Sequence, residues 1–180
     1  YRCENNFTAS DMDAMKSDDV DSILPLFLPV DSEAYYGIAG TAVRTLMRLV
    51  DTGLYPDKAY IMQKTEDENG ALQKVEGEKG FVSALGGKGN ALQFTASVFG
   101  QEEFVSVDED ALDAIGELLN CINGLYVSEC KDGSSLELMP PSFKTGIQGF
   151  ESRKMLVLPI HIKNDCIDLM IAIGDKIEMK

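Results

Sequence analysis

Glu117 and Asn120 are the two side chains in this sequence whose types and spacing best suit chemistry. Residues three apart lie side by side on a helix, so a carboxylate and a carboxamide would project together from one rigid element. An amide can accept a hydrogen bond from a water molecule and donate one to another group without titrating. The pair could therefore orient a reacting water, although polar residues opposite an apolar stripe usually form only a solvated face.

The segment that carries this pair has the pattern of an amphipathic helix from about 107 to 126. Ser106 and Glu109 have the spacing of a capping box, in which each side chain satisfies a backbone donor of the other residue. The helical spacing predicts one broad core-facing side, made of Leu112, Ile115, Leu118, Leu119, Ile122, Leu125 and Tyr126.

The opposite side of the same helix is a narrow stripe of polar and small residues. It consists of Asp110, Asp113, Glu117, Asn120 and Gly124. Gly116 and Gly124 flank the candidate pair, although glycine costs up to about 1 kcal/mol in a helix interior. Small residues let another backbone come close, so this stripe is predicted to be a contact surface.

Each half of the chain is predicted to fold as a helix, then a strand, then a hairpin. In the first half these are 33–52, 59–62, and 81–85 with 91–98. In the second half they are 107–126, 136–139, and 155–162 with 166–173. The polar stretch 64–79 suits an exposed loop or a frayed hairpin.

The two predicted long helices also share a residue pattern. Glu33-x-x-Tyr36-x-x-x-Gly40 has the spacing of Glu117-x-x-Asn120-x-x-x-Gly124, which a degenerate internal duplication would explain.

Length and charge restrict the class of protein. The chain has 180 residues with a net charge of −14 and 44% hydrophobic residues, which suits one globular domain. Such an acidic surface repels phosphate backbones and anionic lipid, and no stretch has the length that spans a bilayer. Residues 1–30 form an acidic arm or linker whose apolar end could dock, and residues 31–180 form the domain.

Two other features of the sequence have simpler explanations than a reactive site. The glycine-rich segment 86–90 lacks the spacing of a nucleotide phosphate loop, and a tight turn explains it. The single histidine, His161, lies in an apolar strand pattern and is expected to be structural.

The setting of the candidate pair resembles a known family. Asp113-x-x-x-Glu117-x-x-Asn120, with Gly124 and the downstream Pro140-Pro141, is similar to the phosphatase signature of the CheC, CheX and FliY chemotaxis proteins. The resemblance extends over about residues 33–175. It implies an α/β (α+β) fold with pseudo-twofold symmetry, in which long helices pack on a largely antiparallel sheet.

The same resemblance implies a function and a partner. The chain would be a cytoplasmic phosphatase that hydrolyses the aspartyl phosphate of a CheY-like receiver domain, with Asn120 orienting the water and Glu117 pairing with the receiver's active-site lysine. Asp113, Gly116, Gly124 and Pro140 would contact the receiver. The chain would bind no cofactor or metal of its own, because the Mg²⁺ ion belongs to the receiver, and a homodimer is expected.

The sequence also departs from the family in two places. CheC-type proteins carry two active helices, but here the first helix has Tyr36 after Glu33, and a phenol lacks the paired donor and acceptor of an amide. One site per chain, as in CheX, is therefore expected. The stretch between Asn120 and the next proline is shorter than in the family.

Two non-enzymatic readings remain open. One is a binding module of the same fold that docks a receiver without hydrolysis, and the other is a scaffold in a signalling pathway. The phosphatase hypothesis alone requires Glu117 and Asn120 to be exposed together, without partners in their own chain.

Overall fold

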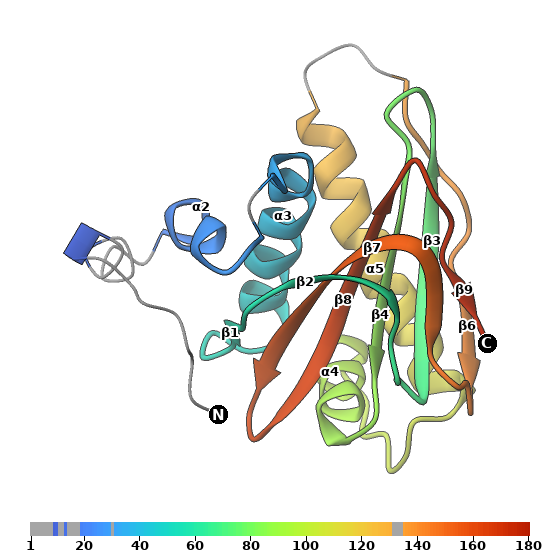
Figure 1. Cartoon of the computed structure of the whole chain (residues 1–180). Helices are drawn as coiled ribbons and strands as arrows, with labels where there is room; N and C mark the ends of the chain where they lie inside the picture. The colour runs from blue at the N-terminus through green and yellow to red at the C-terminus, as the bar shows by residue number, and fades with distance from the viewer. Residues whose placement is uncertain (1–8, 11–12, 14–18, 30, 131–134) are drawn as a thin grey trace.

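A computed structural model describes residues 9–10, 13, 19–29, 31–130 and 135–180, and shows one curled antiparallel sheet with three helices against one face (Figure 1). These helices are α3 (Glu33–Leu49), α4 (Asn90–Gly100) and α5 (Glu109–Glu129). The mixed α/β architecture predicted from the sequence is confirmed.

Two hairpins form the centre of the sheet. The first joins β3 (Asn69–Glu76) to β4 (Phe81–Gly87), and the second joins β7 (Phe150–Ile162) to β8 (Asp165–Ile173). β4 and β8 pair antiparallel with each other, which places the hairpins side by side.

The outer strands reveal the internal symmetry of the sheet. β1 (Tyr55–Pro56) and β2 (Tyr60–Lys64) belong to the first half of the chain but pair with β7 of the second half. Likewise β5 (Glu137–Leu138) and β6 (Ser142–Thr145) belong to the second half but pair with β3 of the first. Each half therefore extends the hairpin of the other, as the predicted pseudo-twofold duplication requires. A short last strand, β9 (Glu178–Met179), adds to β7.

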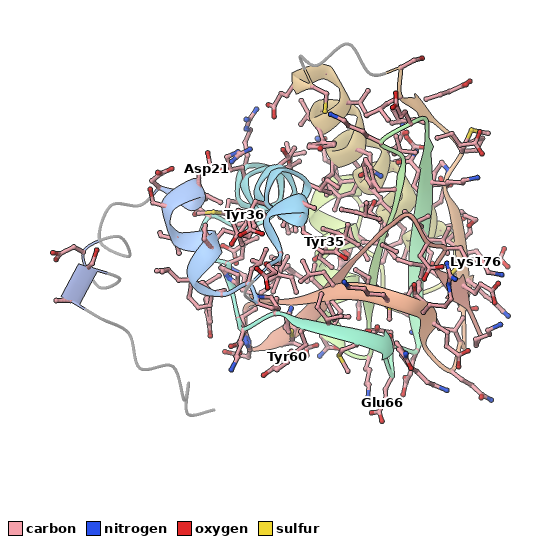
Figure 2. All side chains as sticks on the ribbon, turned by 45° about the horizontal axis from the view of Figure 1, so that its top comes forward. Asp21, Tyr35, Tyr36, Tyr60, Glu66 and Lys176 are labelled. Atoms are coloured by element: carbon pink, nitrogen blue, oxygen red, sulfur yellow. The ribbon has the colours of Figure 1, made fainter. Side chains whose placement is uncertain are left out.

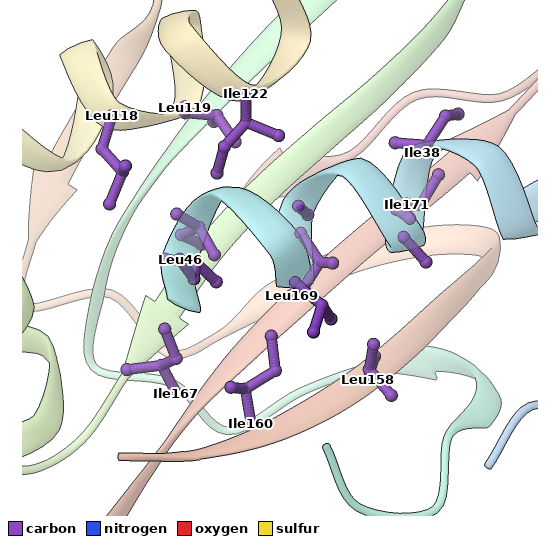
Figure 3. Packing of buried hydrophobic residues seen from close by; sticks show 14 of the residues in the cluster. Ile38, Leu46, Leu118, Leu119, Ile122, Leu158, Ile160, Ile167, Leu169 and Ile171 are labelled. Atoms are coloured by element: carbon purple, nitrogen blue, oxygen red, sulfur yellow. The ribbon is translucent and has the colours of Figure 1, made fainter. Parts of the chain in front are cut away.

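The main core lies between the helices and the sheet, and Figure 3 shows its centre. Leucine and isoleucine side chains from α3 and α5 pack against those of β7 and β8. The labelled residues are Ile38, Leu46, Leu118, Leu119, Ile122, Leu158, Ile160, Ile167, Leu169 and Ile171. Burial of these branched side chains holds α5 rigidly against the sheet, because such interiors are close-packed.

The first hairpin was predicted in the wrong place. The segment from Ala91 to Val98 is part of helix α4, not a strand, since Ala91, Leu92, Thr95 and Ala96 are buried with helical spacing. The strand that pairs with β4 in this hairpin is β3, inside the stretch that was predicted to be an exposed loop or a frayed hairpin. β3 looks polar because Lys74 and Glu76 are exposed near its end, while its other face is buried against the core.

The start and the buried face of α5 differ slightly from the prediction. The capping residue is Asp108, whose Oδ1 accepts a hydrogen bond from the backbone nitrogen of Ala111 at 3.0 Å. The predicted cap, Ser106, lies two residues before it. At the other end of the helix Leu125 is 39% exposed, so the buried side is narrower than its apolar pattern suggests.

We expect Asp108→Ala to lower the free energy of unfolding by about 1 kcal/mol, because a first-turn backbone donor then loses its partner. Urea denaturation measures this loss. Ser106→Ala is the matched control, and it should leave stability nearly unchanged. Equal losses in the two variants would contradict Asp108 as the cap.

Residues 19–29 of the acidic arm pack on the domain. Helix α2 (Val20–Ile23) and the 3₁₀ turn η1 (Leu24–Leu26) lie beside α3, with Leu24 buried in the main core and Asp21 in an ion pair with Arg44. The arm is thus anchored by both an apolar and a charged contact. The rest of the predicted arm falls mostly outside the described residues.

Two carboxyl groups meet near the end of the central strands. Asp67 and Asp168 are largely buried, and Thr65 donates its hydroxyl to Asp67 Oδ2 at 2.6 Å. Burial, followed by the negative charge of Asp67, raises the pKa of Asp168 from its ordinary value of 3.8 to about 7. Gly86 provides the room, because a Cβ there would lie 2.8 Å from Asp67 Cγ.

This pair makes stability depend on pH with a definite sign. Between pH 3.8 and about 7 the folded protein keeps a proton on Asp168 that the unfolded chain releases, so this contribution to stability falls as pH rises. We expect Asp168→Asn to gain stability relative to wild type by about 1 kcal/mol per pH unit between pH 5 and 7. Urea titrations at several pH values measure this. Glu102→Gln, an exposed control, should show no such trend, and an equal trend in both variants would contradict the assignment.

Candidate functional site

Helix α5 presents the predicted polar stripe away from the core. Asp110, Asp113 and Glu117 are exposed, whereas Asn120 and Gly124 are half-buried. No ion pair joins any of the three carboxylates to a cationic group within the described ranges, so the stripe is an uncompensated negative surface. It offers a docking point for a cationic side chain of another molecule.

Glu117 and Asn120 differ in their hydrogen-bond partners within the chain. The Glu117 carboxylate has no hydrogen-bond or ion-pair partner among the described residues. Asn120 has a partner on the sheet side of the helix, because its Oδ1 accepts a hydrogen bond from Gln73 Nε2 at 2.7 Å. Gln73 lies on β3, so the contact ties the exposed stripe of the helix to the sheet beneath it.

The requirement that both side chains be exposed and without partners in their own chain is met by Glu117 among the described residues, but not by Asn120, which is half-buried and bound to Gln73. A carbonyl oxygen has two lone pairs, so Asn120 Oδ1 keeps one acceptor position beside its bond to Gln73. No described residue accepts a hydrogen bond from Asn120 Nδ2. The amide thus retains one acceptor and two donors for a water or a partner.

The glycines of the stripe pack against their own chain. Gly116 is buried, and a Cβ there would lie 3.4 Å from a side-chain carbon of Pro141. Gly116 is therefore not available to a partner, contrary to the prediction, because the β5–β6 segment occupies that space. Gly124 is half-buried near Leu138, and Pro140 is exposed beside the helix. Asp113, Gly124 and Pro140 remain candidates for partner contact.

The two residues predicted to form a degenerate second site lie on α3. Glu33 is exposed at the start of this helix, while Tyr36 is half-buried and packs against the main core. Figure 2 shows Tyr36 close to the arm helix that carries Asp21, and both residues line one small hollow. The arm thus partly covers the α3 counterpart of the α5 stripe.

His161 has structural partners. Its Nε2 lies 2.9 Å from Asp57 Oδ2, and its ring stacks on Tyr55 with centroids 4.8 Å apart. This hydrogen bond is the main cause that lowers the pKa of Asp57. His161 lies on β7, away from the α5 stripe, in agreement with the structural role expected for it.

The described residues contain no group of three or more histidine, cysteine, aspartate or glutamate side chains that could hold a metal ion. Nor does any helix in these ranges combine the length and apolar character needed to cross a bilayer.

Three residues next to the site were not predicted from the sequence. Gln73, Ser83 and Asn123 are buried and join Asn120 in one hydrogen-bond network. Asn123 could have been noticed, since it is a polar residue within the apolar side of α5. Gln73 could not, because β3 was predicted to be an exposed loop or a frayed hairpin.

Comparison with known families identifies the class of protein. The family model described as chemotaxis phosphatase CheX matches residues 70–161, just over half of the chain. The chain therefore belongs to the CheX family of chemotaxis phosphatases. No curated protein matches the sequence.

Solved structures show the same fold. A CheC-like superfamily protein from Shewanella sp. PV-4 aligns with a TM-score of 0.66 at 15% identity, covering 81% of this chain and 99% of its own. The chemotaxis protein CheX from Desulfovibrio desulfuricans aligns with a TM-score of 0.65 at 14% identity, covering 79% and 99%. A CheX–CheY–BeF₃–Mg²⁺ complex from Borrelia burgdorferi aligns with a TM-score of 0.60 at 18% identity, covering 78% and 97%.

Proposed function

We propose that this protein hydrolyses the aspartyl phosphate of a CheY-like receiver domain. The observation that carries the proposal is the pair on α5: an exposed, unpaired carboxylate at Glu117 beside the held amide of Asn120, in a chain of the CheX family. The similar Borrelia burgdorferi complex contains CheY together with CheX, which supports a receiver domain as the partner.

The chemistry demands little of this chain beyond position. The oxygen of a water forms a bond to phosphorus while the bond from phosphorus to the aspartate oxygen breaks, which yields the carboxylate and inorganic phosphate carrying both water hydrogens. An acyl phosphate is already activated, so the rate depends mainly on an aligned water and on charge stabilisation around phosphorus. The Mg²⁺ ion that supplies this stabilisation would lie on the receiver.

Each residue has a distinct part in this scheme. Asn120 accepts a hydrogen bond from the water through the remaining lone pair of Oδ1, which turns a lone pair of the water toward phosphorus. Glu117 pairs with the receiver's active-site lysine and sets the distance between the two proteins. Asp113 and Pro140 border the contact. We infer one site per chain, because Tyr36 replaces the amide on α3.

The direct test uses a phosphorylated CheY-like receiver from the same organism. Its phosphate lifetime is measured with and without this protein, by release of inorganic phosphate. We expect the decay to accelerate in proportion to the concentration of the added protein. Decay no faster than that of the receiver alone would overturn the proposal.

A binding module without catalysis is the second candidate. The observation that favours it is the hydrogen bond from Gln73, which uses one of the two acceptor positions of Asn120. This reading predicts affinity that depends on phosphorylation while the phosphate lifetime stays unchanged. Measuring both quantities on the same samples separates the two functions. Homodimerisation and a cytoplasmic location stay predictions.

A further inference from the structure

A row of polar side chains runs through the apolar interface between the sheet and α5. Gln73 lies on β3 between Ala71 and Val75, which face the same core, and its cross-strand partner is Ser83 on β4. Asn123 of α5 lies above them. Their exposed fractions are 0%, 1% and 0% in the order Gln73, Ser83, Asn123. Burying such groups costs free energy unless each one is hydrogen-bonded, so their arrangement calls for an explanation.

The directions of the hydrogen bonds follow from one backbone carbonyl. Met139 O can only accept, so the group 2.8 Å away is the Gln73 amide nitrogen. Gln73 Oε1 then faces the helix and accepts from Asn123 Nδ2 at 2.8 Å. The second hydrogen of Gln73 Nε2 is left for Asn120, which presents its oxygen at 2.7 Å.

The far end of the row completes the network. Ser83 Oγ lies 3.0 Å from Asn123 Oδ1 and 2.9 Å from Asn123 Nδ2. Among the described residues, no buried side-chain nitrogen or oxygen lacks a partner. A fully satisfied buried network is rigid, and it favours one arrangement of its members over the alternatives.

We propose that Gln73 is a positioning residue that fixes the Asn120 amide in one orientation, in which one lone pair of Oδ1 is bound to Gln73 and the other stays open to the water. This inference rests on the function proposed above. An asparagine on a helix surface would otherwise exchange its oxygen and nitrogen by rotating about its last side-chain bond. Only one of the two orientations places the acceptor and the donors where the water and the phosphoryl group need them.

The same residue links the helix to the segment beside the site. Gln73 donates both to Asn120 of α5 and to Met139, which directly precedes Pro140. Gly116 packs under Pro141 on the same segment. Gln73 is therefore hydrogen-bonded both to the Asn120 amide and to the residue that precedes the exposed Pro140. It sets the position of Asn120 relative to the surface that a receiver would meet.

Two substitutions of Gln73 test the inference through catalysis. Gln73→Met keeps the length of the side chain but removes both donors, and Gln73→Glu replaces the donors with acceptors, which draws the nitrogen of Asn120 inward. We expect either variant to lower the rate of receiver dephosphorylation at saturating protein by ~10-fold, because the water loses its alignment. Affinity for the phosphorylated receiver should change by less than ~3-fold, since a change of that size is under 1 kcal/mol and Glu117 is untouched.

Ser83→Ala is the matched control. The Ser83 hydroxyl is hydrogen-bonded to Asn123, with no side-chain hydrogen bond to Gln73 or Asn120 among the described residues, so its loss weakens the core without freeing the amide. We expect Ser83→Ala to keep both the rate and the affinity near those of wild type. Equal rate losses in Ser83→Ala and Gln73→Met would mean that Gln73 serves stability alone, and the inference would be overturned.

A measurement on the wild-type protein tests the inference without requiring catalytic activity or a variant that folds correctly. The side-chain ¹⁵N order parameter of Asn120 should match that of buried Asn123 and exceed that of Asn90, an exposed asparagine on α4. An Asn120 amide as mobile as Asn90 would overturn the inference.

The activity measurements separate this inference from the proposed function. If wild type is active and Asn120→Ala is inactive while Gln73→Met keeps the wild-type rate, the proposed function stands and only the role of Gln73 fails. If wild type is inactive, the proposed function fails first.

Discussion

Asn120→Ala is expected to reduce receiver dephosphorylation by about 100-fold at saturating protein, because misplacing a reacting group by about 1 Å can cost that much. The substitution removes the only carboxamide on the exposed stripe of α5. It should leave the affinity for the phosphorylated receiver within a few-fold of wild type, since Glu117 and its surroundings are unchanged. Single-turnover decay of the phosphorylated receiver, measured over a range of protein concentrations, separates the rate from the affinity.

A control outside the stripe shows whether the effect is specific to the amide. Glu102 is exposed between α4 and α5. Glu102→Ala should keep the dephosphorylation rate near that of wild type. A rate for Asn120→Ala within about threefold of wild type, less than 1 kcal/mol in the barrier, would contradict the water-orienting role.

Glu117→Lys is expected to weaken binding of the phosphorylated receiver by about 100-fold, since placing like charges across an interface costs several kcal/mol. The variant would set one ammonium group against another, at the receiver's active-site lysine. The dissociation constant, measured by titration with labelled receiver, reports this loss. The rate at saturation should fall less than the affinity does.

The matched control for this variant has the same net charge. Glu102→Lys changes the charge of the chain by the same two units, so it reproduces any long-range effect of reducing the acidic field. We expect Glu102→Lys, which makes the same change in charge outside the stripe, to lower affinity by less than about threefold, because exposed charges away from the contact are screened by salt. A receiver with glutamate in place of that lysine should recover affinity for Glu117→Lys, and no recovery would contradict the direct pairing.

The β7–β8 hairpin and α5 were predictable because their patterns are local, whereas β6 was not predicted. The β7–β8 hairpin has two long apolar runs around Lys163 and Asn164, and Lys163 adopts a positive φ of 58° in that turn. The stripe of α5 follows from the 3.6-residue period alone. Asp113, Glu117 and Asn120 could therefore be placed on one side of one helix before any tertiary contact was known.

The first half was harder because burial there is decided by partners distant in sequence. β3 carries charged residues on its outward face, so its apolar face becomes evident only once β4 and α5 cover it. α4 begins where Asp165 of β8 accepts a hydrogen bond from the backbone nitrogen of Ala91. No pattern within the segment 91–98 contains that contact.

Helical periodicity is set by backbone geometry and needs no partner, so the residue pattern alone places the stripe side chains together on α5. The contacts that support them appear only in the folded chain: Gln73 beneath Asn120, Pro141 over Gly116, and the arm beside Tyr36. These contacts join residues far apart in the chain, and they form because the sheet pairs each half of the protein with the other. Hydrogen bonds and close packing depend on distances that only the folded chain establishes.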